Sequence, residues 1–240
     1  WTISILDGSS GTFLFATELS GFTGTYGIRS ADLNDDGHID LAVTNGQSGG
    51  KLAVLLGNGD GTFAAPVNYT VGNTPHDLEI TDINGDTVPD IVVANSVSGP
   101  PALSIFLGIG DGTFAAGPPI SGYQPYQLVV EDFDGDMIRD ILVTNDINHV
   151  LSLRHGFGDG TFDEPVTFPA IATPQELTSG DVNEDGAMDI IFANWNSEGV
   201  KLLRGNGDGT FQAPVVIPGL DGVESVVLAD MNHDMNLDMV

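Results

Sequence analysis

One acidic nonapeptide recurs five times along the chain, and this repetition constrains the fold more than any other feature. The copies, called loops 1 to 5 below, begin at Asp32, Asp82, Asp132, Asp181 and Asp230, which lie 50, 50, 49 and 49 residues apart. A second motif, GDGTF, follows each of the first four copies and ends at Phe63, Phe114, Phe162 and Phe211, and a degenerate copy, SSGTF, ends at Phe13. The chain is therefore a series of repeats of about fifty residues.

Each repeat has the pattern of four short β-strands. In the second repeat, DLEITD (77–82) alternates apolar and polar residues, and DIVVAN (90–95) is a β-branched run. ALSIFLG (102–108) follows, then the tight turn IGDGT and a short strand. No segment keeps an apolar face at helical period over three turns, so the pattern needs no helices. Four strands in every repeat predict an all-β fold, a β-propeller with one blade per repeat. A linear β-solenoid, whose repeats are usually shorter, is the alternative.

The repeat count predicts five four-stranded blades, the last of them shared by the two ends of the chain. Residues 1–20 match the third and fourth strands of a blade, and residues 220–240 match the first and second. The predicted blades of this single domain, residues 1–240, are 21–70, 71–121, 122–170, 171–219, and 220–240 plus 1–20. The shared blade is about seven residues shorter than the others at its junction, so part of a larger propeller is the alternative.

Each acidic loop carries side-chain oxygen atoms at its positions 1, 3, 5 and 9. These residues are Asp32, Asn34, Asp36 and Asp40; Asp82, Asn84, Asp86 and Asp90; Asp132, Asp134, Asp136 and Asp140; Asp181, Asn183, Asp185 and Asp189; and Asp230, Asn232, Asp234 and Asp238. Ca²⁺ takes about six to eight hard oxygen ligands in flexible geometry. These positions offer neither nitrogen nor sulfur, which argues against zinc or copper. The loops therefore predict Ca²⁺ as the cofactor, up to one ion per repeat and five in all. Asx-rich turns without metal are the alternative.

An EF-hand is excluded, because it needs flanking helices and a glutamate at its twelfth position, where this chain has valine or phenylalanine in predicted strands.

Glycine is distributed unevenly among the loops. Position 6 is Gly37 or Gly186 in two loops and Thr87, Met137 or Met235 in the others. Gly85 and Gly135 at position 4 would partly compensate, but loop 5 has no glycine. We expect loop 5 to be the weakest site, because a non-glycine residue at positive φ is strained.

The pattern D-x-[DN]-x-D-x-x-x-D between two strands, followed by GDGTF, resembles the FG-GAP/VCBS repeats of integrin α-subunit propellers and of some fungal and bacterial lectins. The resemblance covers essentially the whole chain. It implies a propeller with one Ca²⁺ per blade, bound in the loop between the first and second strands. It also implies a secreted or cell-surface location.

Charge and residue types exclude several functions. Against 34 Asp and Glu stand only 6 Lys and Arg, and the formal charge of -28 would repel nucleic acids and anionic membranes. No apolar run is long enough for membrane insertion. The chain has no cysteine, its five histidines are scattered, and it lacks a nucleophile elbow or a phosphate-binding glycine loop. We therefore expect a protein that is not an enzyme.

The variable connections suggest where a ligand binds. They are expected on the face opposite the acidic loops and the GDGTF turns. The candidate residues are Tyr26, His76, Tyr126, Gln175 and Glu224, each six residues before an acidic loop, and Trp195 in a loop between the second and third strands. Aromatic rings beside amides and carboxylates suit sugars, although each residue could instead pack or cap locally. The predicted function is a calcium-stabilised, lectin-like extracellular module that binds glycans. The alternative is a protein-binding or adhesion module, or an accessory domain of a larger surface protein or secreted enzyme.

Overall fold

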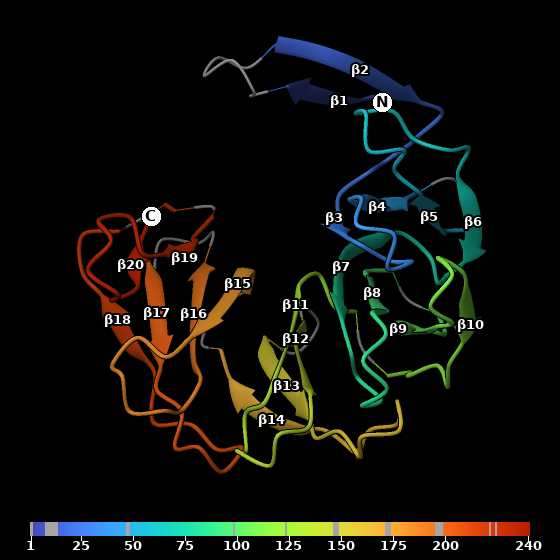
Figure 1. Cartoon of the computed structure of the whole chain (residues 1–240). Helices are drawn as coiled ribbons and strands as arrows, with labels where there is room; N and C mark the ends of the chain where they lie inside the picture. The colour runs from blue at the N-terminus through green and yellow to red at the C-terminus, as the bar shows by residue number, and fades with distance from the viewer. Residues whose placement is uncertain are drawn as a thin grey trace. The chain divides into compact units, whose positions relative to one another are not determined.

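The structure is a computed structural model that describes residues 2–7, 14–46, 49–97, 99–122, 124–145, 149–170, 174–194, 199–220, 222–223 and 225–240. These residues form strands β1 to β20 and no helix (Figure 1), which confirms the all-β prediction. In this part of the chain no helix is therefore available to cross a membrane. The chain forms two compact units. Unit 1 comprises Trp1–Asp82 and Asp86–Gly122, and unit 2 comprises Ile83–Gly85 and Tyr123–Val240.

Unit 1 contains two four-stranded antiparallel sheets and a hairpin. Sheet 1 is β3 (Ile28–Ala31), β4 (Asp40–Asn45), β5 (Lys51–Leu55) and β6 (Val67–Thr70). Sheet 2 is β7 (Pro75–Thr81), β8 (Asp90–Asn95), β9 (Leu103–Gly108) and β10 (Phe114–Ala116). The hairpin pairs β1 (Thr2–Asp7) with β2 (Leu14–Ser20).

Unit 2 repeats this organisation. Sheet 3 is β11 (Leu128–Glu131), β12 (Asp140–Asn145), β13 (Val150–Arg154) and β14 (Val166–Pro169). Sheet 4 is β15 (Pro174–Gly180), β16 (Asp189–Asn194), β17 (Val200–Leu203) and β18 (Val215–Ile217). A short hairpin of β19 (Leu228–Ala229) and β20 (Asp238–Met239) follows.

The four sheets have the same strand register. The residue after the last aspartate of each acidic loop pairs with the equivalent residue of the third strand: Leu41 with Leu55, Ile91 with Phe106, Ile141 with Arg154, and Ile190 with Leu203. The prediction of four strands per repeat is therefore confirmed in four repeats, and the fold is propeller-like at the level of its sheets. The prediction that the two hairpins share a fifth blade stays a prediction.

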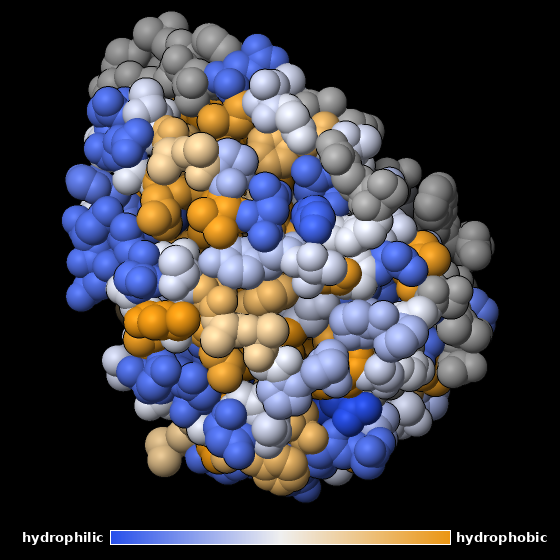
Figure 2. All heavy atoms as spheres, turned by 90° about the vertical axis from the view of Figure 1, so that its right-hand side faces the viewer, coloured by the Kyte–Doolittle hydropathy of each residue, from blue (hydrophilic) through white to orange (hydrophobic). Residues whose placement is uncertain are grey.

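The second strand of each sheet forms the core. Every residue of β4, β8 and β12 is buried, as expected for a β-branched strand covered on both faces. Sheets 1 and 2 share one apolar cluster, which includes Leu52 and Ile91, and sheets 3 and 4 share another. The fourth strands are more exposed. On the face shown in Figure 2, small apolar patches are separated by hydrophilic side chains. The sheets thus provide rigid supports for the loops that join their first and second strands.

Candidate functional site

Loops 1 to 5 each connect the first strand of a sheet or hairpin to the second. In loop 1 the Asp32 carboxylate accepts hydrogen bonds from the backbone N–H groups of Asp36 at 3.2 Å and Gly37 at 2.8 Å. The bond from the residue at position 6 to the aspartate at position 1 recurs in all five loops, at 2.7 to 2.8 Å. The side chain at position 1 therefore organises the loop, as expected of an Asx turn.

Two positions in every loop have a left-handed backbone. At position 4 these residues are Asp35, Gly85, Gly135, Glu184 and His233, with φ between 57° and 80°. At position 6 they are Gly37, Thr87, Met137, Gly186 and Met235, with φ between 69° and 87°. Positive φ was predicted from the sequence at position 6, whereas glycine at position 4 was expected only to compensate partly for a non-glycine residue at position 6. Each of loops 1 to 4 carries glycine at one of the two positions, and loop 5 carries it at neither.

The oxygen atoms at positions 1, 3 and 5 converge. In loop 3 one carboxylate oxygen from each of Asp132, Asp134 and Asp136 lies within 4.8 Å of the others. In loop 1 the Asn34 amide donates to Asp36 Oδ2 at 2.9 Å, and hydrogen bonds from the His38 backbone and from Asn34 lower the pKa of Asp36. Like charges this close repel one another, and a bound cation would offset the repulsion. The donor set is all oxygen, so these residues fit Ca²⁺.

In loops 1 to 4 the aspartate at position 9 has a different environment, because it is buried and holds the loop to the start of the GDGTF turn. Asp40 accepts hydrogen bonds from Leu33 N at 2.9 Å and from Gly57 N at 2.7 Å. Asp140 and Asp189 make the equivalent pairs of bonds. Burial raises the pKa of Asp140 to about 6 and also raises the pKa of Asp189, although these backbone bonds act in the opposite direction. Each carboxylate oxygen keeps a further lone pair, and its role as a Ca²⁺ ligand stays a prediction.

The GDGTF turns are fixed by their own side chains. In each turn a threonine hydroxyl and its backbone N–H both donate to the preceding aspartate, as Thr62 does to Asp60 at 2.6 and 2.9 Å. These bonds lower the pKa of Asp60, Asp111, Asp159 and Asp208. The acidic loops and the turns therefore form one ordered polar region in each repeat.

A pocket of about 460 Å³ lies in this region of unit 1. Its lining consists of Asp32, Leu33, Asp35, Thr87, Val88, Pro89 and Gly110, which belong to loops 1 and 2 and to one GDGTF turn. Tyr26 and His76, the predicted glycan-binding residues of unit 1, do not line this pocket.

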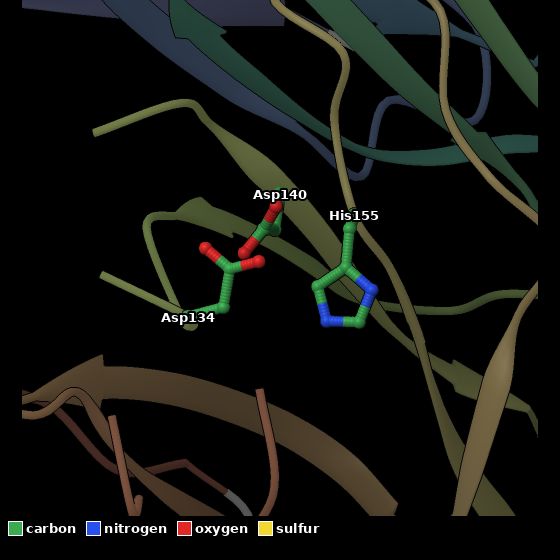
Figure 3. A group of neighbouring side chains, drawn as sticks. All are labelled: Asp134, Asp140 and His155. Carbon is green, nitrogen blue, oxygen red and sulfur yellow. The ribbon is translucent and has the colours of Figure 1, made fainter. Parts of the chain in front are cut away.

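In loop 3 a nitrogen donor from outside the nonapeptide joins the carboxylates. Asp134, Asp140 and His155 lie with one oxygen or nitrogen atom each within 4.8 Å of the others (Figure 3). Positions 1, 3, 5 and 9 of the nonapeptide carry aspartate or asparagine, which offer side-chain oxygen atoms. His155 was not predicted from the sequence, because it follows β13 and only strand pairing brings it to the loop.

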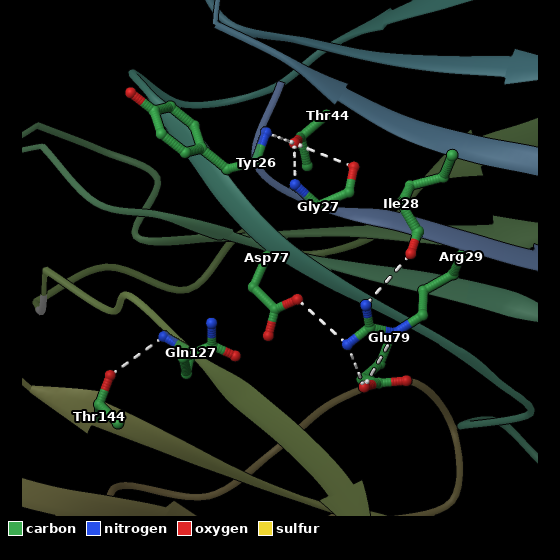
Figure 4. Close-up of polar contacts among 9 residues, drawn as sticks. All are labelled: Tyr26, Gly27, Ile28, Arg29, Thr44, Asp77, Glu79, Gln127 and Thr144. Atoms are coloured by element: carbon green, nitrogen blue, oxygen red, sulfur yellow. Dashed lines mark hydrogen bonds and ion pairs between the residues drawn. The ribbon is translucent and has the colours of Figure 1, made fainter. Parts of the chain in front are cut away.

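Two of the predicted ligand residues meet in unit 1. The rings of Tyr26 and His76 stack, with centroids 4.6 Å apart and planes 15° apart, and Tyr26 is 58% exposed. The backbone beneath Tyr26 is anchored by Thr44, whose hydroxyl accepts from Gly27 N at 2.8 Å (Figure 4). The stack is thus an exposed aromatic surface on a fixed backbone.

A polar cluster links β3, which begins two residues after Tyr26, to β7, which contains His76. Arg29 of β3 donates to Asp77 at 3.2 Å and to Glu79 at 2.9 Å, both on β7 (Figure 4). Asp77 is buried and follows His76 directly, so the aromatic pair and the charged cluster are joined through one strand. Aromatic surface beside fixed hydrogen-bonding groups is the combination predicted for the ligand face.

Of the other candidate ligand residues, the structure describes the side chain of Tyr126. Tyr126 belongs to unit 2, where it is half-buried and its backbone N–H donates to Thr144 Oγ1 at 3.2 Å. Glu224, Trp195 and the side chain of Gln175 lie outside the described residues. Their predicted roles therefore stay predictions.

Comparison with known proteins identifies the repeats. A family model described as FG-GAP-like repeat matches residues 32–93, 82–143, 132–192 and 181–240. No curated protein sequence matches the chain.

Solved structures show a similar fold at low sequence identity. A lectin from Agrocybe aegerita, described as recognising non-reducing terminal N-acetylglucosamine, is 21% identical with a TM-score of 0.53, over 82% of this chain and 52% of its own. The Vibrio cholerae biofilm matrix protein Bap1 is 16% identical with a TM-score of 0.55, over 93% of this chain and 32% of its own. A protein of unknown function from Desulfotomaculum acetoxidans is 15% identical with a TM-score of 0.63, over 95% of this chain and 66% of its own. The chain thus spans about half the length of the lectin that it resembles.

Proposed function

Because the chain belongs to the FG-GAP-like repeat family, we propose that it is a calcium-stabilised, non-catalytic binding module that works outside the cell and binds carbohydrate. Calcium binding is supported by the converging oxygens of positions 1, 3 and 5 and by the net charge of -28. Bound Ca²⁺ would supply positive charge to each loop. The millimolar Ca²⁺ found outside cells suits sites of modest affinity.

The stacked pair of Tyr26 and His76 is the observation that carries the carbohydrate proposal. A sugar ring presents C–H groups that pack on an aromatic face and hydroxyls that need fixed hydrogen-bond partners. The exposed Tyr26 ring offers the first, and the cluster of Arg29, Asp77 and Glu79 offers the second. The Agrocybe aegerita lectin has a similar fold and is described as binding N-acetylglucosamine, which supports a sugar as the ligand class.

Binding to a glycan array in Ca²⁺, followed by titration of the best glycan, tests this proposal. We expect Tyr26→Ala to weaken binding about fivefold or more, because a lost aromatic contact is worth roughly 1 kcal/mol or more. Phe157→Ala is the matched control, since it removes another exposed aromatic ring, 62% exposed, from a GDGTF turn and should leave affinity unchanged. If wild type binds no glycan, or if Tyr26→Ala binds as tightly as wild type, the proposed site is wrong.

The second candidate function is protein binding or adhesion. It is favoured by the likeness in fold to the biofilm matrix protein and by the repeats' resemblance to integrin propellers. A protein partner would need a broad surface, so substitutions at several residues around Tyr26 should each weaken binding, with the largest losses at the centre of the contact. The glycan titration separates the two functions, because only the carbohydrate module responds to free sugar.

We also propose that the two hairpins complete a fifth blade. The hairpin of β1 and β2 matches the third and fourth strands of a repeat, and the hairpin of β19 and β20 matches the first and second. Each is a two-stranded sheet, which is marginally stable by itself in water, so joining them would bury apolar surface and pair open edges.

A further inference from the structure

The third repeat departs from the others at three positions, and all three lie close together in unit 2. Position 3 of its acidic loop is Asp134, where the other loops have Asn34, Asn84, Asn183 and Asn232. His155, which precedes the glycine paired with Phe162, replaces Leu56, Leu107 and Arg204. Asp163, which follows that phenylalanine, replaces Ala64, Ala115 and Gln212. One repeat has thus gained two carboxylates and an imidazole.

The Asp163 side chain fixes the orientation of the His155 ring. Asp163 Oδ1 accepts the His155 backbone N–H at 2.8 Å, and Asp163 Oδ2 lies 3.2 Å from His155 Nδ1. An ionised carboxylate only accepts hydrogen bonds, so the Nδ1 atom carries the proton and the Nε2 atom keeps its lone pair. Histidine residues that bind metals commonly have this carboxylate partner on the other ring nitrogen.

The Nε2 atom of His155 is buried and has no hydrogen-bond partner among the residues that the structure describes. Figure 3 shows the ring nitrogen remote from the histidine Cβ on the side that faces Asp134. The carboxylate of Asp134 and the fully buried Asp140 lie within 4.8 Å of the imidazole, atom to atom. An unshared lone pair and two carboxylates therefore converge on one point.

Packing alone does not require a histidine at this place. The His155 ring packs against Gly209 in the next GDGTF turn, since a Cβ added to this glycine would lie only 2.3 Å from His155 Nε2. The Leu56 side chain packs against Gly112 in the same way, since a Cβ added there would lie 2.7 Å from it. The same gap between a third strand and the following turn is thus filled by leucine in repeat 1. An apolar side chain would fill the same space, so packing explains neither the imidazole nor the aspartate that orients it.

We propose that Asp134, Asp140 and His155 bind a zinc-class divalent cation, with Asp163 as the positioning residue. One imidazole nitrogen and two carboxylates suit Zn²⁺ or Co²⁺ better than Ca²⁺, which takes oxygen ligands almost alone. This site differs from the five loop sites by its imidazole and shares Asp134 and Asp140 with loop 3, where each carboxylate has two oxygens that can serve one ion each. It is independent of the carbohydrate proposal.

Cobalt binding to the full chain in millimolar Ca²⁺ tests the site, since Ca²⁺ occupies the loop sites and Co²⁺ reports nitrogen ligands through its visible absorption. We expect one Co²⁺ per chain, displaced by Zn²⁺. His155→Leu should weaken Co²⁺ binding at least about 100-fold, and Asp163→Asn about 10- to 100-fold, the usual cost of losing an orienting partner. His38→Leu is the matched control, because it removes another histidine that packs beside a GDGTF turn, and it should leave Co²⁺ affinity unchanged.

Nitrogen NMR of the histidine side chains provides the second measurement. Wild type should show His155, identified by its absence in His155→Leu, as the Nδ1–H tautomer, and its Nε2 signal should shift on addition of Zn²⁺. His155→Leu should fold like wild type in Ca²⁺, because repeats 1 and 2 carry leucine there. The proposal is overturned if Co²⁺ affinity is the same in wild type and His155→Leu, or if no histidine signal responds to Zn²⁺.

Discussion

At the scale of single residues, backbone strain distinguishes the acidic loops from one another. All five loops hold positions 4 and 6 in the left-handed region, which costs a non-glycine residue of order 1 kcal/mol or more. Loops 1 to 4 each have this strain at one residue, and loop 5 has it at both His233 and Met235. The prediction that loop 5 is the weakest site therefore has a conformational basis at two positions rather than one.

Replacing Met137 by glycine should stabilise the protein. Met137 has φ of 69° and a side chain that is 92% exposed, so glycine relieves the strained backbone and sacrifices no packing. We expect the free energy of unfolding in Ca²⁺ to rise by about 1 kcal/mol in urea titrations, less the entropy that glycine adds to the unfolded chain. Met137→Ala, which keeps the Cβ, is the control and should give no gain. An equal gain in both variants would show that the backbone is not strained here.

At the scale of elements, the aspartate at position 9 of loops 1 to 4 joins its loop to the glycine at the end of the third strand of the same sheet. Because Asp40 accepts one backbone N–H on each oxygen, Asp40→Asn would turn its NH₂ group toward one of these donors. We expect a loss of about 2 kcal/mol in the free energy of unfolding, measured in chelator so that no Ca²⁺ site contributes. Asp35→Asn removes the same charge from an exposed position where asparagine tolerates positive φ, and it should be nearly neutral. Similar losses in the two variants would mean that charge, not hydrogen bonding, decides the effect.

Much of the organisation of the repeats could be predicted from the sequence, because the pattern of each strand and turn occurs in several repeats. The four-stranded sheets and the loops between first and second strands follow from it directly. The need for positive φ at position 4 was underestimated, because only loops 2 and 3 have glycine there, whereas loops 1 and 4 have Asp35 and Glu184 in the same left-handed conformation. His155 was missed, because its approach to Asp134 and Asp140 depends on the register of β12 and β13, which no local pattern states.

At the scale of the whole molecule, we expect the acidic charge to make stability depend on bound metal. Positions 1, 3, 5 and 9 of the five loops hold 16 carboxylates, and five bound Ca²⁺ would change the formal charge from -28 to -18. We expect excess chelator to lower the melting temperature by tens of degrees, because each ion at 100 times its Kd adds about 2.7 kcal/mol. Sodium chloride of equal ionic strength, which only screens charge, should restore a small part of the loss. A melting curve that chelator leaves unchanged would refute calcium stabilisation.

The chelated protein should also respond to pH. Since burial raises the pKa of Asp140 to about 6, above its unfolded value, its ionisation destabilises the folded state above that pH. The cost is relieved as the pH falls from about 6 toward 4, so the melting temperature in chelator should rise over this range. Below pH 4 the turn aspartates, whose pKa values are lowered, lose their contribution, and stability should fall again. A melting temperature that falls steadily from pH 7 to pH 4 would contradict this assignment.

Closure of a fifth blade is tested by a cysteine pair, in a chain that has no cysteine of its own. The register that pairs Leu41 with Leu55 places Met239 opposite Ile5 when the hairpins are aligned with the other repeats. Ile5→Cys with Met239→Cys should form an intramolecular disulfide on mild oxidation, seen as a shift in non-reducing electrophoresis. Leu6→Cys with Met239→Cys, whose side chains would face opposite sides of the blade, should form little. Equal yields for both pairs, or none for either, would oppose the shared blade.

The placement of glycine at position 4 or position 6 also governs how the repeats can be exchanged with one another. Loops 1 and 4 carry the glycine at position 6, and loops 2 and 3 carry it at position 4. Whole loops are therefore interchangeable without added strain. A crossover between positions 4 and 6 is not neutral. It can join a first half that lacks glycine at position 4 to a second half that lacks glycine at position 6, which is the arrangement of loop 5. The reciprocal product carries two glycines and no strained residue, so shuffling between repeats can generate both the weakest and the most relaxed loop of such an array.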